Sequence, residues 1–257
     1  AQNNNLAACN TLTSNSSAGL RISNCSNNTV RDNTTTGGSY GFDLYSSGSN
    51  NTFTNNIVRA NSAQGIHVEG SNSNSLIAGN LIANNLQYGI QVIGATGISI
   101  VQNTFDSNAS YQIHLTTNST YGVTSSDTIA KNNFLPSPTN PDSGVLNTTN
   151  NTFDLSRNWW GTSDSALVDK RAADTASPEK ITVQPFRLGT ADTTAAGDTT
   201  APKAPDTVAI MGAPSDTSIL VDWAAVTALE ETNGGAVGVA GYRVYRSEVK
   251  DTSSWVK

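Results

Sequence analysis

Hydrophobic residues recur along the first part of the chain three positions before an asparagine, in the pattern apolar-x-x-Asn. The seven copies of this pattern end at the following residues: Asn10, Asn33, Asn56, Asn80, Asn103, Asn132 and Asn158. The spacings between them are 23, 23, 24, 23, 29 and 26 residues. A period in the low twenties without a helical hydrophobic repeat is typical of a solenoid, in which each repeat stacks on the next.

The positions of the apolar residues within one repeat predict three short strands. Around Asn80, apolar residues lie three positions before it, at Ile77, and two positions after it, at Ile82. Strand side chains alternate between faces, so these two residues cannot face the same side of one straight strand, and the chain must turn just before the asparagine. A third apolar pair, Ile90 and Val92, follows a glycine. Three strands and three corners per repeat predict an all-β fold, a parallel β-helix of about seven rungs whose apolar columns fill the interior.

Asparagine suits the predicted corners for two reasons. It tolerates left-handed backbone geometry better than other residues that carry a Cβ. When rungs stack at about 4.8 Å, equivalent side chains can also hydrogen-bond along the column. A second asparagine follows the first by five residues in four repeats, at Asn15, Asn61, Asn85 and Asn108. The segments 116–127 and 136–144 lengthen two repeats and are predicted to be loops.

The composition changes after the repeats and predicts the domain organisation. Only Asn233 follows Asn158 among the asparagines, and a Thr-, Ala- and Asp-rich tract follows the segment 181–186, which is predicted to belong to a cap. We therefore expect a β-helix with its cap at 1–188, a linker at 189–204 and a second domain at 205–257.

Charge and motifs argue against several classes of function. The net charge is −6 and 13% of the residues are charged, without a basic stripe, so nucleic acid and anionic membranes are poor partners. Apolar runs are too short for a membrane span. The sequence contains no Gly-rich phosphate loop, nucleophile elbow or HExxH motif, and we expect no cofactor.

The repeats resemble those of the right-handed parallel β-helix superfamily, particularly its NosD-like and carbohydrate-binding, sugar-hydrolase type repeats. The resemblance covers roughly residues 4–188 and is carried by units such as residues 77–85, Ile-Ala-Gly-Asn-Leu-Ile-Ala-Asn-Asn, and by the closing Asn-Trp-Trp-Gly at residues 158–161. It implies the fold. The superfamily includes lyases, epimerases, hydrolases, adhesins and surface-layer components, so the resemblance implies no single activity.

The tail resembles a fibronectin type III domain. Residues 201–205 look like its entry, residues 218–223 like its second strand and residues 241–247 like its third. Such sandwiches need roughly 90 to 100 residues, more than the segment 205–257 provides. The tail is therefore interpreted either as part of a longer protein or as a half-sandwich completed by another chain.

One outward residue lies between the two apolar residues of the third predicted strand in five repeats. These residues are Arg21, Asp43, His67, Gln91 and His114. Stacking should place them in one column on a flat face, with Tyr45, Glu69, Ile93 and Thr116 two residues further on. This strip is a candidate contact surface for a glycan or a partner. The alternative is an ordinary solvated face.

Catalytic and metal chemistry are weaker hypotheses for the same face. Asp43 and Glu69 on neighbouring rungs could approach the roughly 5 to 9.5 Å separation that paired carboxylates need, with His67 or Arg21 assisting a lyase. His67 and His114 lie two rungs apart, about 9.6 Å, which is too far for one metal ion, so no metal site is predicted.

The two cysteines, Cys9 and Cys25, are a candidate disulfide, because an exposed thiol is unusual in a secreted protein.

Three functions remain open. The chain could be an extracellular or cell-surface structural or adhesive protein, contacting polysaccharides, glycans or copies of itself and possibly assembling into filaments. It could also be a polysaccharide lyase or epimerase, or a glycan-binding module of a larger enzyme.

Overall fold

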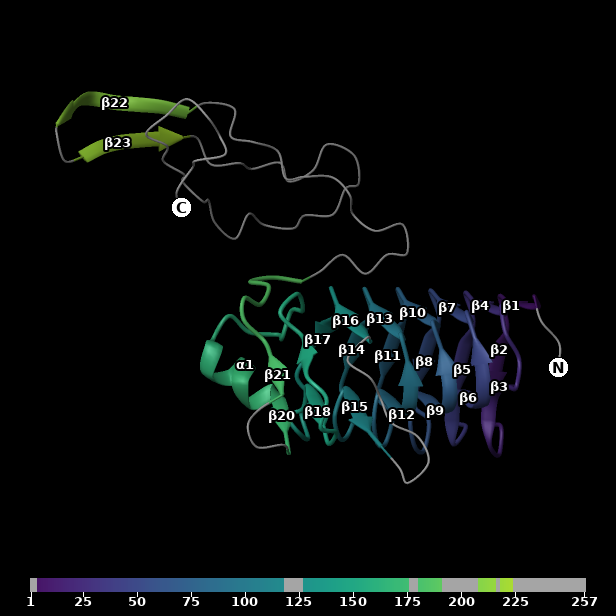
Figure 1. Ribbon diagram of the computed structural model, residues 1–257. Coiled ribbons are helices and arrows are strands. Elements are labelled where there is room, and N and C mark those ends of the chain that lie inside the picture. Colours follow the sequence, from purple (N-terminus) through teal and green to yellow (C-terminus); the bar gives the residue numbers. More distant parts are fainter. Residues whose placement is uncertain (1–3, 118–126, 176–179, 191–207, 216–217, 224–257) are drawn as a thin grey trace. The chain divides into compact units, whose positions relative to one another are not determined.

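The computed structural model describes residues 4–117, 127–175, 180–190, 208–215 and 218–223 (Figure 1). The chain divides into two compact units, Ala1–Gly197 and Asp198–Lys257. The domain bounds 1–188, 189–204 and 205–257 stay predictions.

The described part of the first unit is a coil of three parallel sheets, and each rung adds one strand to each sheet (Figure 1). Sheet A contains β1 (Leu6–Ala8), β4 (Thr29–Arg31), β7 (Thr52–Thr54), β10 (Leu76–Ala78), β13 (Ser99–Val101) and β16 (Thr128–Ala130). Sheet B contains β2 (Thr11–Thr13), β5 (Thr34–Thr36), β8 (Ile57–Arg59), β11 (Leu81–Ala83), β14 (Thr104–Asp106) and β17 (Asn133–Phe134). Sheet C contains β3 (Ala18–Ser23), β6 (Tyr40–Ser49), β9 (Ile66–Ser73), β12 (Ile90–Thr96), β15 (Ile113–Thr116), β18 (Val145–Asn147) and β20 (Ala172–Asp174). The predicted all-β parallel helix of about seven rungs is confirmed.

The apolar residues of the repeat form continuous columns inside the coil. Ile77 pairs with Phe53 and Ile100 on the neighbouring rungs of sheet A, while Ile82 pairs with Val58 and Phe105 in sheet B; all six side chains are buried. Each rung therefore contributes inward residues from three directions, and stacking removes them from water. One position breaks the sheet B column. Thr35 is fully buried there, and its hydroxyl has no hydrogen-bond partner among the described residues.

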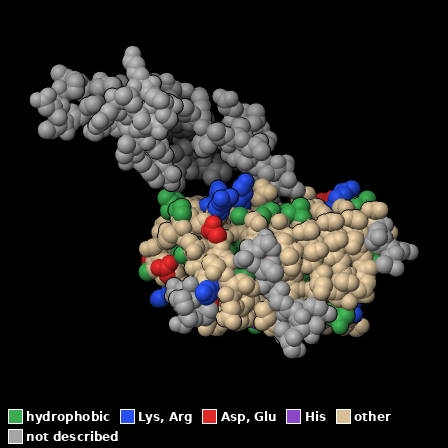
Figure 2. Space-filling view, in the orientation of Figure 1, with side chains coloured by type: hydrophobic (Ala, Val, Ile, Leu, Met, Phe, Trp, Pro, Cys, Tyr) green, Lys and Arg blue, Asp and Glu red, His purple; other side chains and the backbone are tan. Residues whose placement is uncertain are grey.

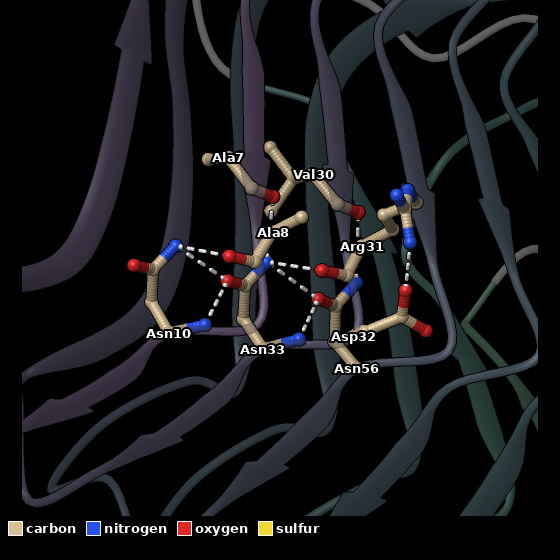
Figure 3. A network of polar contacts seen from close by, with 8 residues as sticks. All are labelled: Ala7, Ala8, Asn10, Val30, Arg31, Asp32, Asn33 and Asn56. Carbon is tan, nitrogen blue, oxygen red and sulfur yellow. Dashed lines mark hydrogen bonds and ion pairs between the residues drawn. The ribbon is translucent and has the colours of Figure 1, made fainter.

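The predicted asparagine ladder is present beside the corner between sheets A and B (Figure 3). The Nδ2 group of Asn33 donates to Oδ1 of Asn56 at 3.1 Å and to the carbonyl oxygen of Ala7 at 2.9 Å. Its own Oδ1 accepts from the backbone N–H of Asn10 at 2.9 Å. Each side chain thus satisfies backbone groups that the turn leaves unpaired, and it links one rung to the next.

The structure corrects the expected reason for asparagine at this position. The left-handed residue is the one immediately before the ladder asparagine, for example Asp32 with φ 57°, Asn55 with φ 55° and Lys131 with φ 57°. The ladder asparagine is instead selected by its hydrogen bonds, because its side chain points back into the coil. The preceding residue points outward, and several residue types occupy it at the cost of strained backbone.

A further ladder, which the sequence reading missed, runs between sheets C and A. Asn5 donates through both its backbone N–H and its Nδ2 group to Oδ1 of Asn28, which repeats this arrangement toward Asn51. Ser75 continues the row by accepting from the backbone N–H of Asn51 at 3.1 Å. Each of these residues lies immediately before a sheet A strand. Asp127 holds the equivalent place before β16, where its Oδ1 accepts from the backbone N–H of Ile98 at 2.8 Å.

We expect Asp127→Asn to stabilise the coil at neutral pH. Burial raises the pKa of Asp127 to about 6 from 3.8, and its second carboxylate oxygen is buried without a partner among the described residues. Because the folded-state pKa is the higher one, the native protein is favoured below pH 4 and loses this contribution as the pH rises through about 6. An amide keeps the acceptor and restores the donor that other residues of this ladder use. After allowance for partial exposure, the gain at pH 7.5 should be about 1 kcal/mol.

Chemical denaturation of Asp127→Asn and the parent protein at pH 4 and pH 7.5 measures this effect. The two proteins should have equal unfolding midpoints at pH 4 and different midpoints at pH 7.5. Equal midpoints at both values would contradict the assignment. Asp32→Asn, at an exposed corner, is the matched control and should show no such pH-dependent gain.

The C-terminal end of the coil contains a helix that the sequence pattern did not predict. Helix α1 (Ser165–Arg171) begins after Asp164, whose side chain accepts from the backbone N–H of Ala166, and it buries Val168. Short strands β19 (Phe153–Asp154) and β21 (Ile181–Thr182) pair beside it. Arg171 is also buried; it donates to the carbonyl oxygen of Trp160 and, at 3.0 Å, to that of Pro141. Burial lowers the pKa of this guanidinium.

The structure describes one of the two predicted loops in full and the other only in part. Within the segment 136–144, Ser143 donates to the carbonyl oxygen of Asn140, and Arg171 bonds to this loop through Pro141. Much of the segment 116–127 lies outside the described residues.

The second unit is described only at β22 (Val208–Ser215) and β23 (Ser218–Trp223), which pair in an antiparallel arrangement. The strand expected at residues 218–223 is therefore present. The strand expected at residues 241–247 lies outside the described residues, and the fibronectin type III domain stays a prediction.

Candidate functional site

The predicted row on sheet C is assembled by the parallel register of five strands. Arg21 on β3, Asp43 on β6 and His67 on β9 are direct neighbours, and Gln91 on β12 and His114 on β15 continue the row. In the second predicted row, Tyr45 pairs with Glu69, followed by Ile93 and Thr116. The sequence therefore located both rows correctly on one face.

The first row is much less exposed than an ordinary solvated face. Asp43 is 1% exposed, His67 is 6% exposed and His114 is 9% exposed, whereas Arg21 remains exposed. Rings from the preceding rung cover the two histidines. Tyr40 stacks on His67 with ring centroids 4.8 Å apart and planes within 11° of parallel, and Tyr88 lies against His114 at 4.6 Å.

A connected network of charged groups and one imidazole occupies the first three rungs of the row. The carboxylate of Asp43 accepts from Nε of Arg21 at 2.6 Å and contacts Nδ1 of His67 at 3.0 Å. On its other side, Nε2 of His67 lies 3.7 Å from a carboxylate oxygen of Glu69. The guanidinium of Arg21 also lies over the ring of Tyr45, 5.4 Å from its centroid. Asp43 is buried with two basic partners, which is the condition under which a carboxylate tolerates removal from water.

A second chain of polar contacts continues along the same row. Gln64 donates to Oε1 of Gln91 at 2.6 Å, and the amide nitrogen of Gln91 lies 3.2 Å from Nδ1 of His114. Nε2 of His114 lies 3.3 Å from the hydroxyl of Thr148. Burial lowers the pKa of His114, which favours the neutral ring. A neutral ring that accepts from Gln91 at Nδ1 can donate from Nε2 to Thr148, so these contacts select one tautomer.

These contacts define what the face can do chemically. The hydrogen bond to Asp43 holds Nδ1 of His67, which leaves Nε2 as the ring atom available for proton transfer beside Glu69. The remaining row is occupied by amide and imidazole groups that already bond to one another, next to the ring of Tyr88. Such an arrangement is rigid and presents polar groups and ring faces, which are the features of a preorganised binding surface.

The covering residues were missed by sequence reading. Tyr40, Gln64, Tyr88 and Tyr111 each immediately precede the glycine, or the Gln112 that replaces it, at the entry to a sheet C strand. The repetition of a large polar or aromatic residue before this position was a usable signal. The pattern does not give the direction of these side chains, and only the structure shows Tyr40, Gln64 and Tyr88 contacting the next rung.

The two histidines of the row lie on different strands of sheet C. The strand β12 separates His67 on β9 from His114 on β15, in agreement with the predicted distance of two rungs. The described residues contain no group of three His, Cys, Asp or Glu side chains that could hold a metal ion.

The candidate disulfide between Cys9 and Cys25 is not formed, and both thiols are free. Cys9 lies at the corner between β1 and β2, whereas Cys25 follows β3 at a different corner. The thiol of Cys25 instead donates to the carbonyl oxygen of Ser23 at 3.1 Å. The sequence proximity of the two cysteines was misleading because different corners of the coil point in different directions.

A cavity of about 440 Å³ opens at the first rung, next to this face. Its lining includes Ala7, Leu20 and Val30, which belong to the interior columns, together with Arg21. It is therefore largely the end of the apolar interior and carries little chemistry of its own.

The fold and the repeated ladder define a class of protein, the right-handed β-helices. The family model described as "Right handed beta helix region" matches residues 1–159, and the chain belongs to this family. Neither the curated proteins nor the solved structures gave a significant match. In the part of the chain that the structure describes, no helix is long and apolar enough to cross a membrane.

Proposed function

We propose that this protein is an extracellular or cell-surface β-helical scaffold that contacts glycans through the outer face of sheet C. The observation that carries the proposal is the row from Asp43 to His114, in which polar side chains repeat once per rung beneath the rings of Tyr40 and Tyr88. The repeat of about 4.8 Å is comparable to the length of one sugar unit in an extended chain.

The chemistry of the row fits hydroxyl-rich ligands. Amide and imidazole groups both donate and accept hydrogen bonds, and the faces of tyrosine rings offer apolar contact to sugar rings. The mutual bonds among Gln64, Gln91 and His114 hold the side chains in place before a ligand arrives, so less conformational entropy is lost on binding.

A glycan array followed by calorimetry on the full chain tests this proposal. We expect binding to at least one polysaccharide class and a loss of tenfold or more in Tyr88→Ala and Gln91→Ala. Leu81→Ala is the matched control, because Leu81 is 38% exposed on sheet B and should leave affinity unchanged. Absence of binding, or equal affinity in all variants, would remove the proposal.

Catalysis is a second candidate function, favoured by the contacts among Asp43, His67 and Glu69. A polysaccharide lyase or epimerase needs a base that abstracts a proton from the sugar, and Nε2 of His67 is the atom placed for this step. Screening acidic polysaccharides for unsaturated products or altered epimer ratios tests it. Activity that persists in the double variant Asp43→Asn with Glu69→Gln would exclude this site.

Self-association is the other partner hypothesis, and a filament of stacked coils would present the sheet C face repeatedly. Light scattering and electron microscopy at high concentration test it, and a sharply monomeric protein would exclude it.

The remaining possibility, a glycan-binding module of a larger enzyme, predicts the same binding result as the scaffold. The full reading frame around this segment would distinguish the scaffold from the glycan-binding module.

A further inference from the structure

The two tryptophans of the closing Asn-Trp-Trp-Gly point in opposite directions. Trp160 is fully buried, and its ring lies 4.9 Å from that of Phe134 inside the coil. Trp159 is half-buried and lies on the outer side, because side chains alternate along an extended segment. Its backbone continues the line of sheet B through a bridge to Asn133 and a hydrogen bond of 2.9 Å from its N–H to the carbonyl oxygen of Asn132.

No specific contact with a described residue explains the position of the Trp159 indole. Among the described residues, no ring contact, cation–π contact or side-chain hydrogen bond involves it. Tryptophan is a large apolar side chain with one donor, and an outward ring of this kind is a common anchor in binding sites.

Three exposed cations lie on consecutive rungs at this end of the coil. Lys131 precedes the ladder asparagine of one rung and Arg157 precedes that of the next, and the backbone N–H of Lys131 donates to the carbonyl oxygen of Arg157 at 2.9 Å. Arg187 occupies the following rung, where its N–H donates to the carbonyl oxygen of Asn158 at 3.0 Å. Figure 2 shows Lys and Arg side chains gathered near β16 at this end of the coil, on a surface that otherwise carries few charges.

The three cations have no close polar partner among the described residues. None of the three side chains makes an ion pair or a hydrogen bond to a described residue. Arg157 acts electrostatically on Asp154. The pKa of Asp154 is lowered first by hydrogen bonds from Ser156 and then by the positive charge of the arginine. The equivalent corner positions on earlier rungs carry no cation; they are neutral at Asn55 and Gln102 and acidic at Asp32. In a chain of net charge −6, this is a local concentration of positive charge around an outward aromatic ring.

We propose that Trp159, Lys131, Arg157 and Arg187 form a binding site for an acidic polysaccharide that carries one carboxylate per sugar. The indole stacks on a sugar ring, and the cations pair with carboxylates of that sugar and its neighbours along the chain. Cations one rung apart, about 4.8 Å, match charges that recur once per sugar. This site lies at the edge of sheets A and B and does not depend on the sheet C face.

The site is too small for an extended electrostatic footprint on nucleic acid. Duplex binding relies on many phosphate contacts, whereas three cations of the described residues gather here and the chain as a whole is acidic. A sugar chain needs fewer charges, because ring stacking supplies part of the affinity.

Calorimetry and tryptophan fluorescence with the full chain test the proposal, using oligogalacturonate as the probe. The same oligosaccharide with its carboxylates methyl-esterified is the uncharged counterpart, and dextran sulfate and single-stranded DNA are unrelated polyanions. We expect binding to oligogalacturonate that weakens with added salt, and at least tenfold weaker binding to the ester and to both other polyanions.

Variants separate the site from general charge attraction. The triple variant Lys131→Gln, Arg157→Gln, Arg187→Gln should lose tenfold or more in affinity. The matched triple variant Arg31→Gln, Arg59→Gln, Lys170→Gln changes the net charge equally at other exposed positions and should lose less than threefold. Trp159→Ala should weaken binding, and Trp159→Phe should restore part of it, with thermal unfolding confirming that both fold.

Several results would overturn the proposal. Equal losses in the two triple variants, or equal binding of dextran sulfate or DNA, would show nonspecific charge attraction. Unchanged affinity in Trp159→Ala would remove the sugar-stacking role. Because Tyr88→Ala lies on sheet C, it should leave oligogalacturonate binding intact, so this result is distinguishable from failure of the sheet C proposal.

Discussion

Replacing Asn80 by alanine should destabilise the coil by about 4 kcal/mol, one of the two largest effects that we expect from a single substitution. The Nδ2 group of Asn80 donates to the carbonyl oxygens of Phe53 and Ala78 and to Oδ1 of Asn103, at 2.9 to 3.1 Å. Its Oδ1 accepts from the backbone N–H and the Nδ2 group of Asn56, both at 2.9 Å. Alanine leaves these groups unpaired in the interior, where water cannot replace the lost bonds.

The same substitution at the exposed end of the ladder is the matched control. Asn10 is exposed, and among the described residues its side chain donates to Oδ1 of Asn33 and to the carbonyl oxygen of Ala8 alone. Asn10→Ala should therefore cost about 1 kcal/mol or less. Urea denaturation measures both values. Similar losses at Asn80 and Asn10 would show that position in the ladder is unimportant.

A partial replacement separates the roles of the two ends of the amide. Asn80→Ser should be less harmful than Asn80→Ala, because Ser75 shows that a hydroxyl can accept from the backbone N–H of the neighbouring rung. It cannot supply the several donors of the amide. An Asn80→Ser variant as unstable as Asn80→Ala would indicate that the donors carry almost all of the effect.

Gly65→Ala is the second substitution with a large expected effect, about 3 kcal/mol of destabilisation. A Cβ at Gly65 would lie 2.7 Å from the carbonyl oxygen of Gly89, 2.7 Å from Nδ2 of Asn85 and 2.9 Å from Cγ2 of Ile82. The first is backbone of the next rung, the second belongs to a ladder and the third to the core. None can move without disturbing the stacking of the rungs.

Gly189→Ala is the control for the intrinsic effect of replacing glycine. A Cβ at Gly189 would meet no atom of a described residue within 4 Å, so the change should stay within about 0.5 kcal/mol. Thermal unfolding of the two variants beside the parent protein measures the difference. If Gly65→Ala melted with the parent protein, the close approach of successive rungs at this corner would be wrong.

The repeated pattern was sufficient to predict the strands and corners of the coil. Ile77, Ile82 and Ile90 recur at fixed distances from a ladder asparagine, and alternation of strand side chains leaves only a turn between the first two. The end of the coil was harder. Helix α1 is only seven residues long, and no repeat accompanies it, so neither periodicity nor neighbouring copies could reveal it.

The candidate site was predicted in position but not in environment. The alternation of side chains along a strand predicted that Asp43, His67 and His114 lie on the outside of sheet C, and the strand register agrees. Their burial depends on Tyr40 and Tyr88 folding over the following rung, a contact between residues more than 25 positions apart in sequence. No local pattern specifies such a rotamer, since it depends on the space left by the neighbouring rung.

By itself, the sequence determined the stacking of this protein: a period of about 23 residues, three apolar columns and an asparagine at each ladder position are local and repetitive, and every copy reinforces the same register. Only the tertiary structure decided which outward residues are covered and which remain free. It buries Asp43 between Arg21 and His67, and it leaves Trp159 beside cations brought together from three rungs. The physical reason is that stacking depends on a few recurring side chains, whereas exposure depends on the particular side chains of adjacent rungs.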